Sequence, residues 1–491
     1  MGIAKNYFYN VLLQISNILI PLITTPYVTR VLDPSGFGIV SFANSIVQYF
    51  ILFGTLGLNL YGSRLIAYVR NDKEKLEKTF WELFWLRSLT IFLAILSYII
   101  FLYLSNPSFI EVYLIQILNL LAVAFDISFL FIGMEKFKIV SLRGVTARLI
   151  TAGLIFILVK GKDDFAIYAL INAIGNLVSQ VIVWKYLFQY IPTVKRVPFR
   201  KSVKHLPGSV KLFIPMIAIQ IYTVLDRTML GILSSEDQVG IYTPGVTLVK
   251  MATSLVTSLG TVMLSRISNL VANKEERMLR FYSEKAFDFA TYASLFIVLN
   301  LYILMPSFVP IFFGKEFQSV LHVIKVICPI VLFISWSNFF GIQLMLPMQL
   351  EKAFTLSVSI GAIVNFFLNL FLIPKHGAIG ASIATVVAEF SVTLSQMILI
   401  RTIINLFEFF KKAWKHFLSA FGTFVISLIV SRLITFEGNN LFSLVLNGLL
   451  VAVSYFLMEK MLKSGINDIV FSKMVSFLRR FFRVKSQSLF F

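Results

Sequence analysis

Apolar stretches of about 18 residues or more recur along nearly the whole chain, separated by short polar or proline-containing segments. As a helix, each stretch is long enough to cross the roughly 30 Å hydrocarbon core of a bilayer. The pattern predicts an all-α polytopic membrane protein with about 14 transmembrane helices, one of them kinked at Pro329. The predicted spans are residues 7–29, 36–62, 80–104, 111–133, 139–159, 165–190, 209–233, 239–262, 283–305, 318–346, 353–373, 379–401, 414–434 and 441–462.

The composition of the chain supports the same class. Hydrophobic residues make up 58% of the 491 residues, charged residues only 14%, and the mean hydropathy is +0.84. A soluble fold has too little interior to bury so much apolar surface. The net charge of +20 would suggest nucleic-acid binding in a soluble protein. Here the basic residues lie between apolar segments, where they indicate topology and attraction to anionic lipid.

The basic residues also predict the orientation of the chain. With the N-terminus in the cytoplasm, about 32 Lys and Arg lie in inner loops and tails, about 6 in outer loops and about 6 inside helices. An even number of helices then places both termini in the cytoplasm. The outer loops are short and nearly uncharged.

A weak internal repeat organises the chain. Residues 38–71 align without gaps on residues 240–273. Six helices per repeat give both copies the same orientation, related by an axis along the membrane normal. The tail has alternating apolar and basic residues, so we expect it to lie on the anionic inner leaflet, a disordered basic tail being the alternative. The predicted parts are an N-lobe (1–190), a basic cytoplasmic linker (191–208), a C-lobe (209–401), two further helices (402–462) and a cytoplasmic amphipathic basic tail (463–491).

The sequence lacks the motifs of common membrane enzymes and motors. It has no GxxxxGK[ST] motif, no HExxH or CxxC motif, and four scattered histidines. Its one cysteine, Cys328, lies in an apolar run and is expected to be part of the core. The short outer loops leave no room for the site of a glycan polymerase or ligase. We therefore expect no catalysis, no metal and no cofactor, and movement of a substrate across the bilayer instead.

Charged side chains inside the predicted helices are the candidate functional groups. Each costs about 2.5–3.5 kcal/mol at the bilayer centre, so each needs a partner, a wet cavity or a route to the interface. Arg87 and Lys185 lie near inner helix ends, where a long side chain can reach the interface. The deeper charges are the bases Arg148, Arg227, Lys250 and Lys325 and the acids Asp126, Asp226 and Glu389.

Two interpretations of these deep charges remain open. Acids and bases could pair across helices and stabilise the bundle. Alternatively, the bases could line a wet cationic cavity that attracts an anionic substrate, while the acids balance the field or carry a coupling proton or sodium ion. The bases outnumber the deep acids, which favours the cavity.

Prolines interrupt helices at corresponding places in the two repeats. Pro21 and Pro26 lie in the first predicted helix and Pro215 in the seventh. Proline removes a backbone donor and kinks a helix, and interruptions at matching places of two repeats often mark a transport site. We predict gating kinks at these three prolines, the alternative being kinks that serve packing alone.

Two segments resemble known proteins. Residues 25–70 (beginning TPYVTRVLDPSGFGIV) and residues 214–249 (beginning IPMIAIQIYTVLDRTML) resemble the Wzx-type polysaccharide flippases. These flippases form the polysaccharide-transporter branch of the superfamily that includes the MATE multidrug extruders and the lipid II flippases (MOP superfamily). The resemblance implies two six-helix MATE-like lobes around a central cavity, with two extra C-terminal helices.

The resemblance also implies a function and further site residues. It implies that an undecaprenyl-diphosphate-linked oligosaccharide repeat unit moves from the inner to the outer leaflet of the bacterial cytoplasmic membrane, for O-antigen, capsule or exopolysaccharide synthesis. A proton or sodium gradient would drive this secondary transport, and a polysaccharide polymerase and a chain-length regulator would be partners. The residues carried over to a cationic cavity are Arg30, Arg64, Asp226, Arg227, Lys250 and Arg266.

Other functions stay open at this point. The same architecture could export another lipid-linked glycan, of the lipid II or teichuronic type, or a small molecule as MATE proteins do. A membrane glycan polymerase or ligase is the alternative from another class. A major-facilitator transporter is less favoured because residues 63–75 (SRLIAYVRNDKEK) lack that family's glycine–aspartate–arginine signature.

Overall fold

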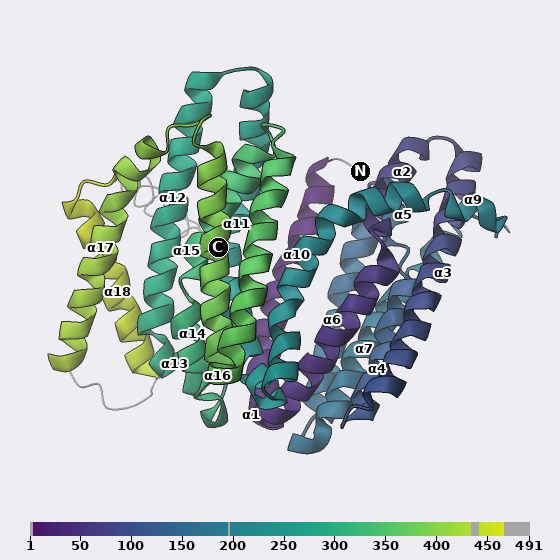
Figure 1. Ribbon diagram of the computed structural model, residues 1–491, viewed down its shortest axis with the longest axis horizontal. Coiled ribbons are helices and arrows are strands. Elements are labelled where there is room, and N and C mark those ends of the chain that lie inside the picture. The colour runs from purple at the N-terminus through teal and green to yellow at the C-terminus, as the bar shows by residue number, and fades with distance from the viewer. Residues whose placement is uncertain (1–2, 195–196, 434–440, 466–491) are drawn as a thin grey trace, which may run out of the picture. The chain divides into compact units, whose positions relative to one another are not determined.

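The computed structural model describes residues 3–194, 197–433 and 441–465, which are helical nearly throughout and contain no strand (Figure 1). The predicted amphipathic tail falls largely on residues 466–491, outside the described residues. The helices are α1 (Ile3–Thr55), α2 (Leu58–Val69), α3 (Lys73–Ser105), α4 (Ile110–Ala124), α5 (Ser128–Gly133), α6 (Phe137–Leu158), η1 (Lys162–Asp164), α7 (Phe165–Ile182), α8 (Trp184–Leu187), α9 (Phe199–Val203), α10 (Leu206–Leu233), α11 (Glu236–Ala272), α12 (Glu276–Ile303), α13 (Met305–Phe312), η2 (Lys315–Phe317), α14 (Val320–Ile327), α15 (Ile330–Ser337), η3 (Asn338–Met345), α16 (Glu351–Ile400), α17 (Leu406–Leu433) and α18 (Leu441–Met461).

Ten segments of the described chain are long and apolar enough to cross a membrane, and a bent pair raises the number to eleven. Two of the ten, Val11–Val69 and Glu351–Ile400, contain 59 and 50 residues. At 1.5 Å per residue these segments are much longer than a bilayer is thick, so each must cross more than once. The polytopic all-α class is confirmed, while the count of about 14 helices stays a prediction.

Helix α1 breaks where the sequence predicts the end of one span and the start of the next. Asp33 has φ 54° and ψ 175°, the one non-helical residue inside α1. Its Oδ1 accepts a hydrogen bond from the backbone N–H of Gly36 at 3.0 Å, and Pro34 follows it. An aspartate cap followed by proline is a typical start of a helix, because proline needs no backbone partner there.

The second predicted span, 36–62, is not one helix, and this prediction is wrong. Gly57 has φ 72° and separates α1 from α2. A Cβ on this residue would lie 3.1 Å from Phe213 N and 3.2 Å from Ser209 O, at the start of α10. The hydroxyl of Ser209 donates a hydrogen bond to the carbonyl of Leu56. Glycine suits this turn because its positive φ disfavours other residues, and α10 leaves little room for a Cβ.

Two other predicted interruptions are present. Helix α16 breaks at Gly377 (φ 51°, ψ −129°), between the predicted spans 353–373 and 379–401. Helices α14 and α15 meet at an angle of 42° across Cys328 and Pro329, so the kink predicted at Pro329 is confirmed. Proline and glycine therefore set the breaks, as their backbone restrictions require.

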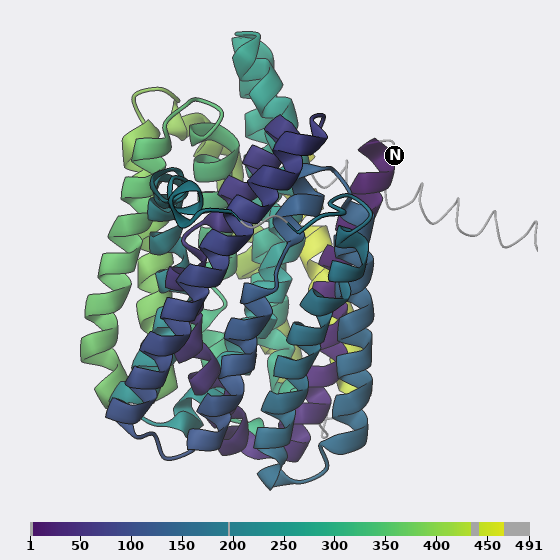
Figure 2. The same cartoon turned by 90° about the vertical axis from the view of Figure 1, so that its right-hand side faces the viewer.

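The contacts divide the chain into two compact units. Unit 1 is Met1–Pro244, Phe313–Phe317 and Phe366–Ala381, and unit 2 is Gly245–Phe312, Gln318–Asn365 and Ser382–Phe491. In unit 1, α3, α4 and α7 run side by side in both views, and the core between them includes buried Tyr98 and Leu120 (Figures 1 and 2).

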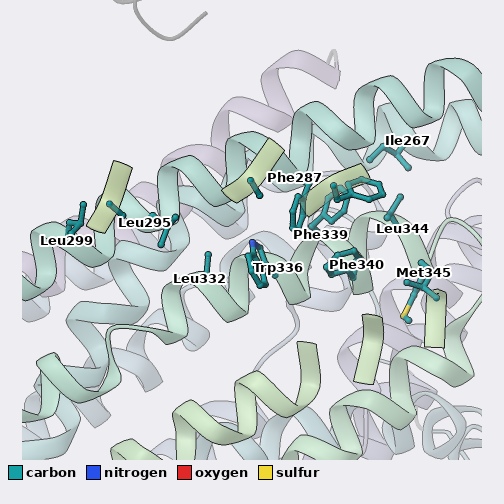
Figure 3. Close-up of a cluster of buried hydrophobic side chains, with 14 of the residues drawn as sticks. Ile267, Phe287, Leu295, Leu299, Leu332, Trp336, Phe339, Phe340, Leu344 and Met345 are labelled. Carbon is teal, nitrogen blue, oxygen red and sulfur yellow. The ribbon is translucent and has the colours of Figure 1, made fainter. Parts of the chain in front are cut away.

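Six of the sixteen buried residues in the core of unit 2 are aromatic. The ring of Phe287 on α12 lies 5.5 Å from the ring of Trp336 and 5.3 Å from that of Phe339, centroid to centroid (Figure 3). Phe409 on α17 and Tyr455 on α18 belong to the same cluster. The two C-terminal helices therefore pack into the main core of this unit.

Two glycines make a reciprocal contact within unit 1. A Cβ on Gly38 would clash with the backbone of Glu236 and Gly240, and a Cβ on Gly240 would clash with the backbone of Pro34 and Gly38. Gly38 and Gly240 are the residues that the predicted repeat aligns with each other. A mutual contact between equivalent positions is what a two-fold relation between repeats produces, and it supports that prediction.

Candidate functional site

A polar pocket of about 360 Å³ lies between α1, α6 and α7 in unit 1. Helix α7 contributes Asn172, Asn176, Ser179 and Gln180, which follow the helical repeat and so share one face. Pro21, Thr24, Thr25 and Arg148 line it from α1 and α6. The pocket offers amides, hydroxyls and two guanidinium groups, and none of its described lining residues is acidic.

Small residues on α6 and α7 make room for this pocket. Gly144 and Ala147 stand on the α6 face that lines it. A Cβ on Gly175 of α7 would clash with the hydroxyl of Thr151 on α6, so the two helices approach closely at that level. The pocket lies on one side of this contact.

An apolar groove of about 480 Å³ adjoins the polar pocket along α6 and α7. The two cavities share Arg143, Ala147, Thr151 and Gly175 among their lining residues. The rest of the groove is largely aliphatic and includes Leu142, Ile150, Leu154, Ile174, Val178 and Ile182. Arg143 therefore lines both a polar and an apolar cavity.

Arg143 is a site residue that the sequence analysis missed. Its Nη1 donates to Gln180 Oε1 at 2.6 Å and its Nη2 to Ser128 Oγ at 2.9 Å. Both partners are neutral, and Ser128 in turn donates a hydrogen bond to the carboxylate of Asp126. The sequence signal for this site was the presence of three polar residues, Arg143, Arg148 and Thr151, within one apolar helix.

Arg148 is the predicted base that the structure places in the polar pocket. It lies on α6, and its Nη1 is 3.4 Å from Ser16 Oγ on α1. Pro21 also lines the pocket. The α1 backbone stays helical through Pro21 and Pro26 and breaks at Asp33, while the side chain of Pro215 lies outside the described set. The gating kinks therefore stay a prediction.

Asp126 lies beside buried Arg87 and is linked to half-buried Arg143 through Ser128. Its Oδ2 is 3.7 Å from Arg87 Nη1, and its Oδ1 accepts from the backbone N–H of Ser128 at 2.9 Å. The hydroxyl of Ser128 donates to the same carboxylate and accepts from Arg143. This polar chain lies at the short break between α4 and α5, inside the predicted span 111–133, which the structure has as one candidate membrane span, Ile110–Gly133.

The prediction that Arg87 reaches the interface is wrong. Its side chain is fully buried, donates to the carbonyl of Asp126 and to Asn59 Oδ1, and lies over the ring of Phe129 at 5.2 Å. An ion pair with Asp126 replaces the water that a charged head would otherwise need. Arg87 is thus a paired structural charge.

Asp226 is held by side chains from two other helices. It is buried on α10, where Tyr242 Oη donates to its Oδ2 at 2.5 Å and Asn369 Nδ2 donates to its Oδ1 at 2.8 Å. These bonds connect α10, α11 and α16 within unit 1. Its neighbour Arg227 is half-buried on the same helix.

The other predicted residues do not line the polar pocket. In unit 1, exposed Arg64 donates its Nε–H to Tyr68 Oη at 2.9 Å, and Arg30 lies near Gly314. In unit 2, Arg266 lies over the ring of Tyr282 at 5.1 Å and Lys325 over that of Tyr302 at 5.4 Å. The remaining two residues of unit 2 are exposed Lys250 and buried Glu389.

The described residues contain no group of three or more His, Cys, Asp or Glu side chains that could hold a metal ion. The side chains that line the polar pocket also have no metal-ligating set among them, since its polar groups are amides, hydroxyls and guanidinium groups. The chemistry of this site is therefore binding by hydrogen bonds and positive charge.

Comparison with known proteins places the chain among transporters. A family model described as "Polysaccharide biosynthesis protein" matches residues 3–271, more than half of the chain. Proteins named "Putative O-antigen transporter" from Escherichia coli (strain K12) and Shigella dysenteriae are 27% and 26% identical to it. The alignments cover 82% and 79% of this chain and 97% and 98% of those proteins.

Solved structures share the fold. The lipid II flippase MurJ, in an inward closed conformation, has a TM-score of 0.71 at 15% identity, covering 93% of this chain and 98% of its own. An inward-facing multidrug resistance MATE family transporter of the MOP superfamily has a TM-score of 0.61 at 15% identity, covering 78% and 93%. The MATE-like fold class is confirmed. All four proteins carry the names of transporters or flippases, in agreement with the prediction that the chain is not an enzyme.

Proposed function

The chain belongs to the polysaccharide biosynthesis protein family, and we propose on this premise that it is a flippase for a lipid-linked polysaccharide precursor. The predicted resemblance to the polysaccharide transporters is confirmed by the family match and the two O-antigen transporter relatives. The proposed substrate is an undecaprenyl-diphosphate-linked oligosaccharide repeat unit. It moves from the inner to the outer leaflet of the bacterial cytoplasmic membrane, for O-antigen, capsule or exopolysaccharide synthesis.

The observation that carries this proposal is the pairing of the polar pocket with the apolar groove. Arg143 and Arg148 supply positive charge where no acidic side chain lines the pocket. A diphosphate cannot enter hydrocarbon without replacing its hydration, and guanidinium groups do so with charge-assisted and bidentate hydrogen bonds. The amides of Asn172, Asn176 and Gln180 suit sugar hydroxyls, and the aliphatic groove suits a polyprenyl chain.

The proposed mechanism is alternating access. The N-lobe (1–190) and the C-lobe (209–401) rock against each other about the basic linker (191–208), as in other transporters built from repeats. Both termini stay in the cytoplasm. Substrate and membrane lipids are the partners, and a polysaccharide polymerase and a chain-length regulator act on the same pathway.

A proton or sodium gradient is the proposed driving force. Among the predicted coupling acids, Asp226 is buried and joins three helices through Tyr242 and Asn369. Asp126 is less suited because Arg87 already neutralises it. Glu389 is buried on α16. A loss or gain of charge at Asp226 would change contacts on α10, α11 and α16 together.

Replacing Arg148 by alanine tests the proposed function. In proteoliposomes that hold an undecaprenyl-diphosphate-linked oligosaccharide, lectin binding to sugar that reaches the far leaflet measures transport. A hydrogen bond to a charged group is worth about 1.5–3 kcal/mol, so we expect Arg148→Ala to slow transport roughly 10- to 100-fold. Arg148→Lys keeps the charge but not the fork geometry of the guanidinium. Its transport rate should lie between those of the unaltered protein and Arg148→Ala.

The matched control is Arg70→Ala, which removes an exposed arginine paired with Glu135 at 2.7 Å. It should transport as the unaltered protein does. Transport by the unaltered protein that is no faster than in empty liposomes would contradict the proposed function. Equal rates for Arg148→Ala and Arg70→Ala would remove Arg148 from the site.

A further inference from the structure

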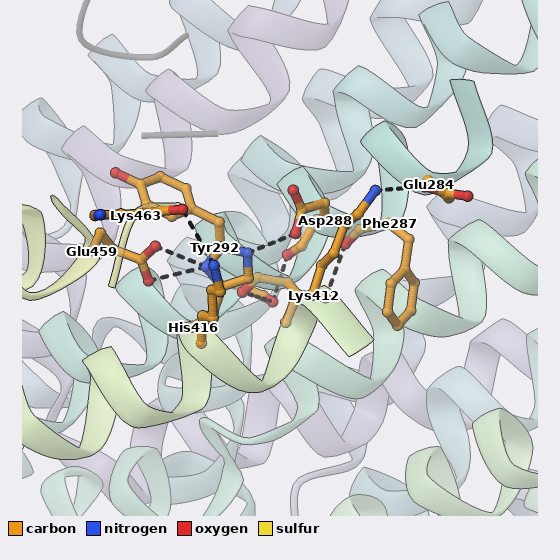
Figure 4. Close-up of polar contacts among 12 residues, drawn as sticks. Glu284, Phe287, Asp288, Tyr292, Lys412, His416, Glu459 and Lys463 are labelled. Carbon is orange, nitrogen blue, oxygen red and sulfur yellow. Dashed lines mark hydrogen bonds and ion pairs between the residues drawn. The ribbon is translucent and has the colours of Figure 1, made fainter. Parts of the chain in front are cut away.

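A buried histidine in unit 2 lies between two carboxylates that come from two other helices (Figure 4). His416 on α17 has its Nε2 2.8 Å from Asp288 Oδ1 on α12. Its Nδ1 is 2.9 Å and 3.0 Å from the two oxygens of Glu459 on α18. The exposed fractions of the three side chains are 1%, 10% and 0%, in the order His416, Asp288, Glu459.

This geometry fixes the smallest number of protons in the cluster. A carboxylate only accepts hydrogen bonds, and a neutral imidazole has one N–H donor and one acceptor nitrogen. If both acids were ionised and the histidine neutral, the lone pair of one ring nitrogen would point at a lone pair of a carboxylate oxygen, and the two would repel each other. The cluster therefore holds a second proton, and its net charge with two protons is −1.

The cluster also has a place for a third proton. Asp288 Oδ1 faces the histidine, whereas Oδ2 is not the oxygen that Nε2 contacts. A proton added at Oδ2 forms an O–H bond, changes the net charge from −1 to 0 and leaves both histidine hydrogen bonds in place. Neutralisation is favourable because an unbalanced charge in a low-dielectric interior is costly.

Protons can reach the cluster from one side. Glu284 and Lys412 lie one helical turn before Asp288 and His416, and they form an ion pair of 2.6 Å. Their side chains are 19% and 54% exposed, so water reaches within one turn of the cluster. Aromatic side chains cover another side, where the ring of Tyr292 lies 5.7 Å from that of His416.

The titratable and charged groups around the cluster are few. Tyr455 Oη donates to the carbonyl of Tyr292, and Lys415 Nζ donates to the carbonyl of Lys463. Arg280 bridges Glu284 and Glu408 further out. Among the described residues, the titratable and charged groups that neighbour the cluster on α12, α17, α18 and just past α18 include Glu284, Tyr292, Lys412, Lys415, Tyr455 and Lys463.

A metal ion does not suit the same place. The imidazole ring separates the two carboxylates, one at each ring nitrogen, so their oxygens do not converge on a common point. No metal-holding group occurs among the described residues. Each ring nitrogen has a carboxylate oxygen at hydrogen-bond distance, which is the arrangement for sharing protons between the three side chains.

We propose that His416, Asp288 and Glu459 form a proton-binding site that takes up and releases one proton at Asp288 during the transport cycle. In each uptake a hydronium ion gives its proton to Asp288 Oδ2 and leaves as water, and release is the reverse step. The site couples α12 to the C-terminal helices α17 and α18, which share their core packing with it. Its role in transport rests on the proposed function, whereas its proton binding does not.

Proton binding is tested first without any substrate. Infrared difference spectra of the detergent-solubilised full chain are recorded between acid and alkaline pH. Because each of the 24 Asp and Glu residues can contribute a carboxyl C=O band at acid pH, the spectrum of Asp288→Asn is subtracted from that of the unaltered protein. Asp288→Asn has nearly the same shape and keeps an acceptor toward His416, and the subtraction should leave the C=O band of one carboxyl group that disappears as pH rises. Glu284→Gln is the matched control one turn away, and its spectrum should keep that band. A subtraction that leaves no band for Asp288→Asn overturns the proposal.

Transport is tested second. In proteoliposomes holding the undecaprenyl-diphosphate-linked oligosaccharide, a pH gradient should accelerate transport by the unaltered protein and leave Asp288→Asn unaccelerated. Glu459→Gln provides a second variant, should Asp288→Asn not fold. If both variants respond to the gradient as the unaltered protein does, or only a sodium gradient accelerates transport, the coupling role is overturned and the flippase function stands. If nothing is transported while the infrared band titrates, the proposed function fails and the proton site stands.

Discussion

Two buried histidines, one in each unit, differ in a single neighbour. His205 in unit 1 has Tyr61 Oη 3.0 Å from its Nδ1 and Glu82 Oε2 2.8 Å from its Nε2. His416 in unit 2 has a carboxylate at each ring nitrogen. A tyrosine hydroxyl both donates and accepts, so a neutral His205 satisfies both contacts, whereas a neutral His416 cannot.

The difference shows that burial alone does not fix the charge of a histidine. Burial lowers the pKa of His205 below its usual 6.5, against the opposing effect of the Glu82 carboxylate. At His416 the second acid demands a second proton. The donor and acceptor character of the neighbours decides how many protons each site holds.

Replacing each histidine by leucine should give the largest difference in stability between the two sites. His416→Leu leaves Asp288 and Glu459 buried with no cation between them, and losing one member of a buried charged group costs about 3–5 kcal/mol. His205→Leu leaves Glu82 with Lys204 Nζ at 3.0 Å, so we expect a smaller loss of about 1–3 kcal/mol. Chemical unfolding of the two variants in the same detergent measures both, and equal losses would contradict the distinction.

The second-largest effect should be that of acid on the stability that His205 contributes. Because its pKa is lowered in the folded chain, the unfolded chain binds more protons at this histidine as pH falls below about 6.5. The stability that His205 contributes is therefore present above that pH and is lost as pH falls toward its lower folded value. The melting temperature should fall less between pH 7 and pH 5 in His205→Gln than in the unaltered chain. An identical fall would show that another group is responsible.

The smallest effect should come from an ion pair with no burial. Arg70 and Glu135 lie 2.7 Å apart with exposed fractions of 39% and 60%. Exposed pairs contribute about 0–1 kcal/mol because water and salt screen them. Arg70→Ala should change the melting temperature little, and raising the salt concentration should reduce the difference further. If Arg70→Ala lost as much stability as His205→Leu, solvent exposure would not indicate how much a charged contact contributes to the stability of this protein.

The sequence predicted features that depend on local chemistry. The breaks near Asp33, Gly377 and Pro329 follow from capping, a positive φ and a missing backbone donor, all of which the local residues specify. Arg148 was predicted for a similar reason, because a base in the middle of an apolar helix needs a polar surrounding. The structure supplies that surrounding from α1 and α7.

Features that depend on distant partners were not predictable from one sequence. The partner of Arg87 is Asp126, on another helix, and without it an escape to the interface was the simpler prediction. The four histidines are scattered along the sequence, yet His416 contacts acids 128 and 43 residues away. The break at Gly57 depends on the approach of α10. Helix faces, which decide all three, cannot be derived from hydropathy.

The reciprocal contact of Gly38 and Gly240 has a mechanical consequence. Two helices meet there as bare backbones, with no side chains to interlock. Where side chains interdigitate, sliding one helix past another requires many rotamers to change together. Where two backbones cross without intervening side chains, a small rotation of one helix changes no side-chain rotamer. Such a crossing resists rotation less than the interlocked side chains on either side of it do.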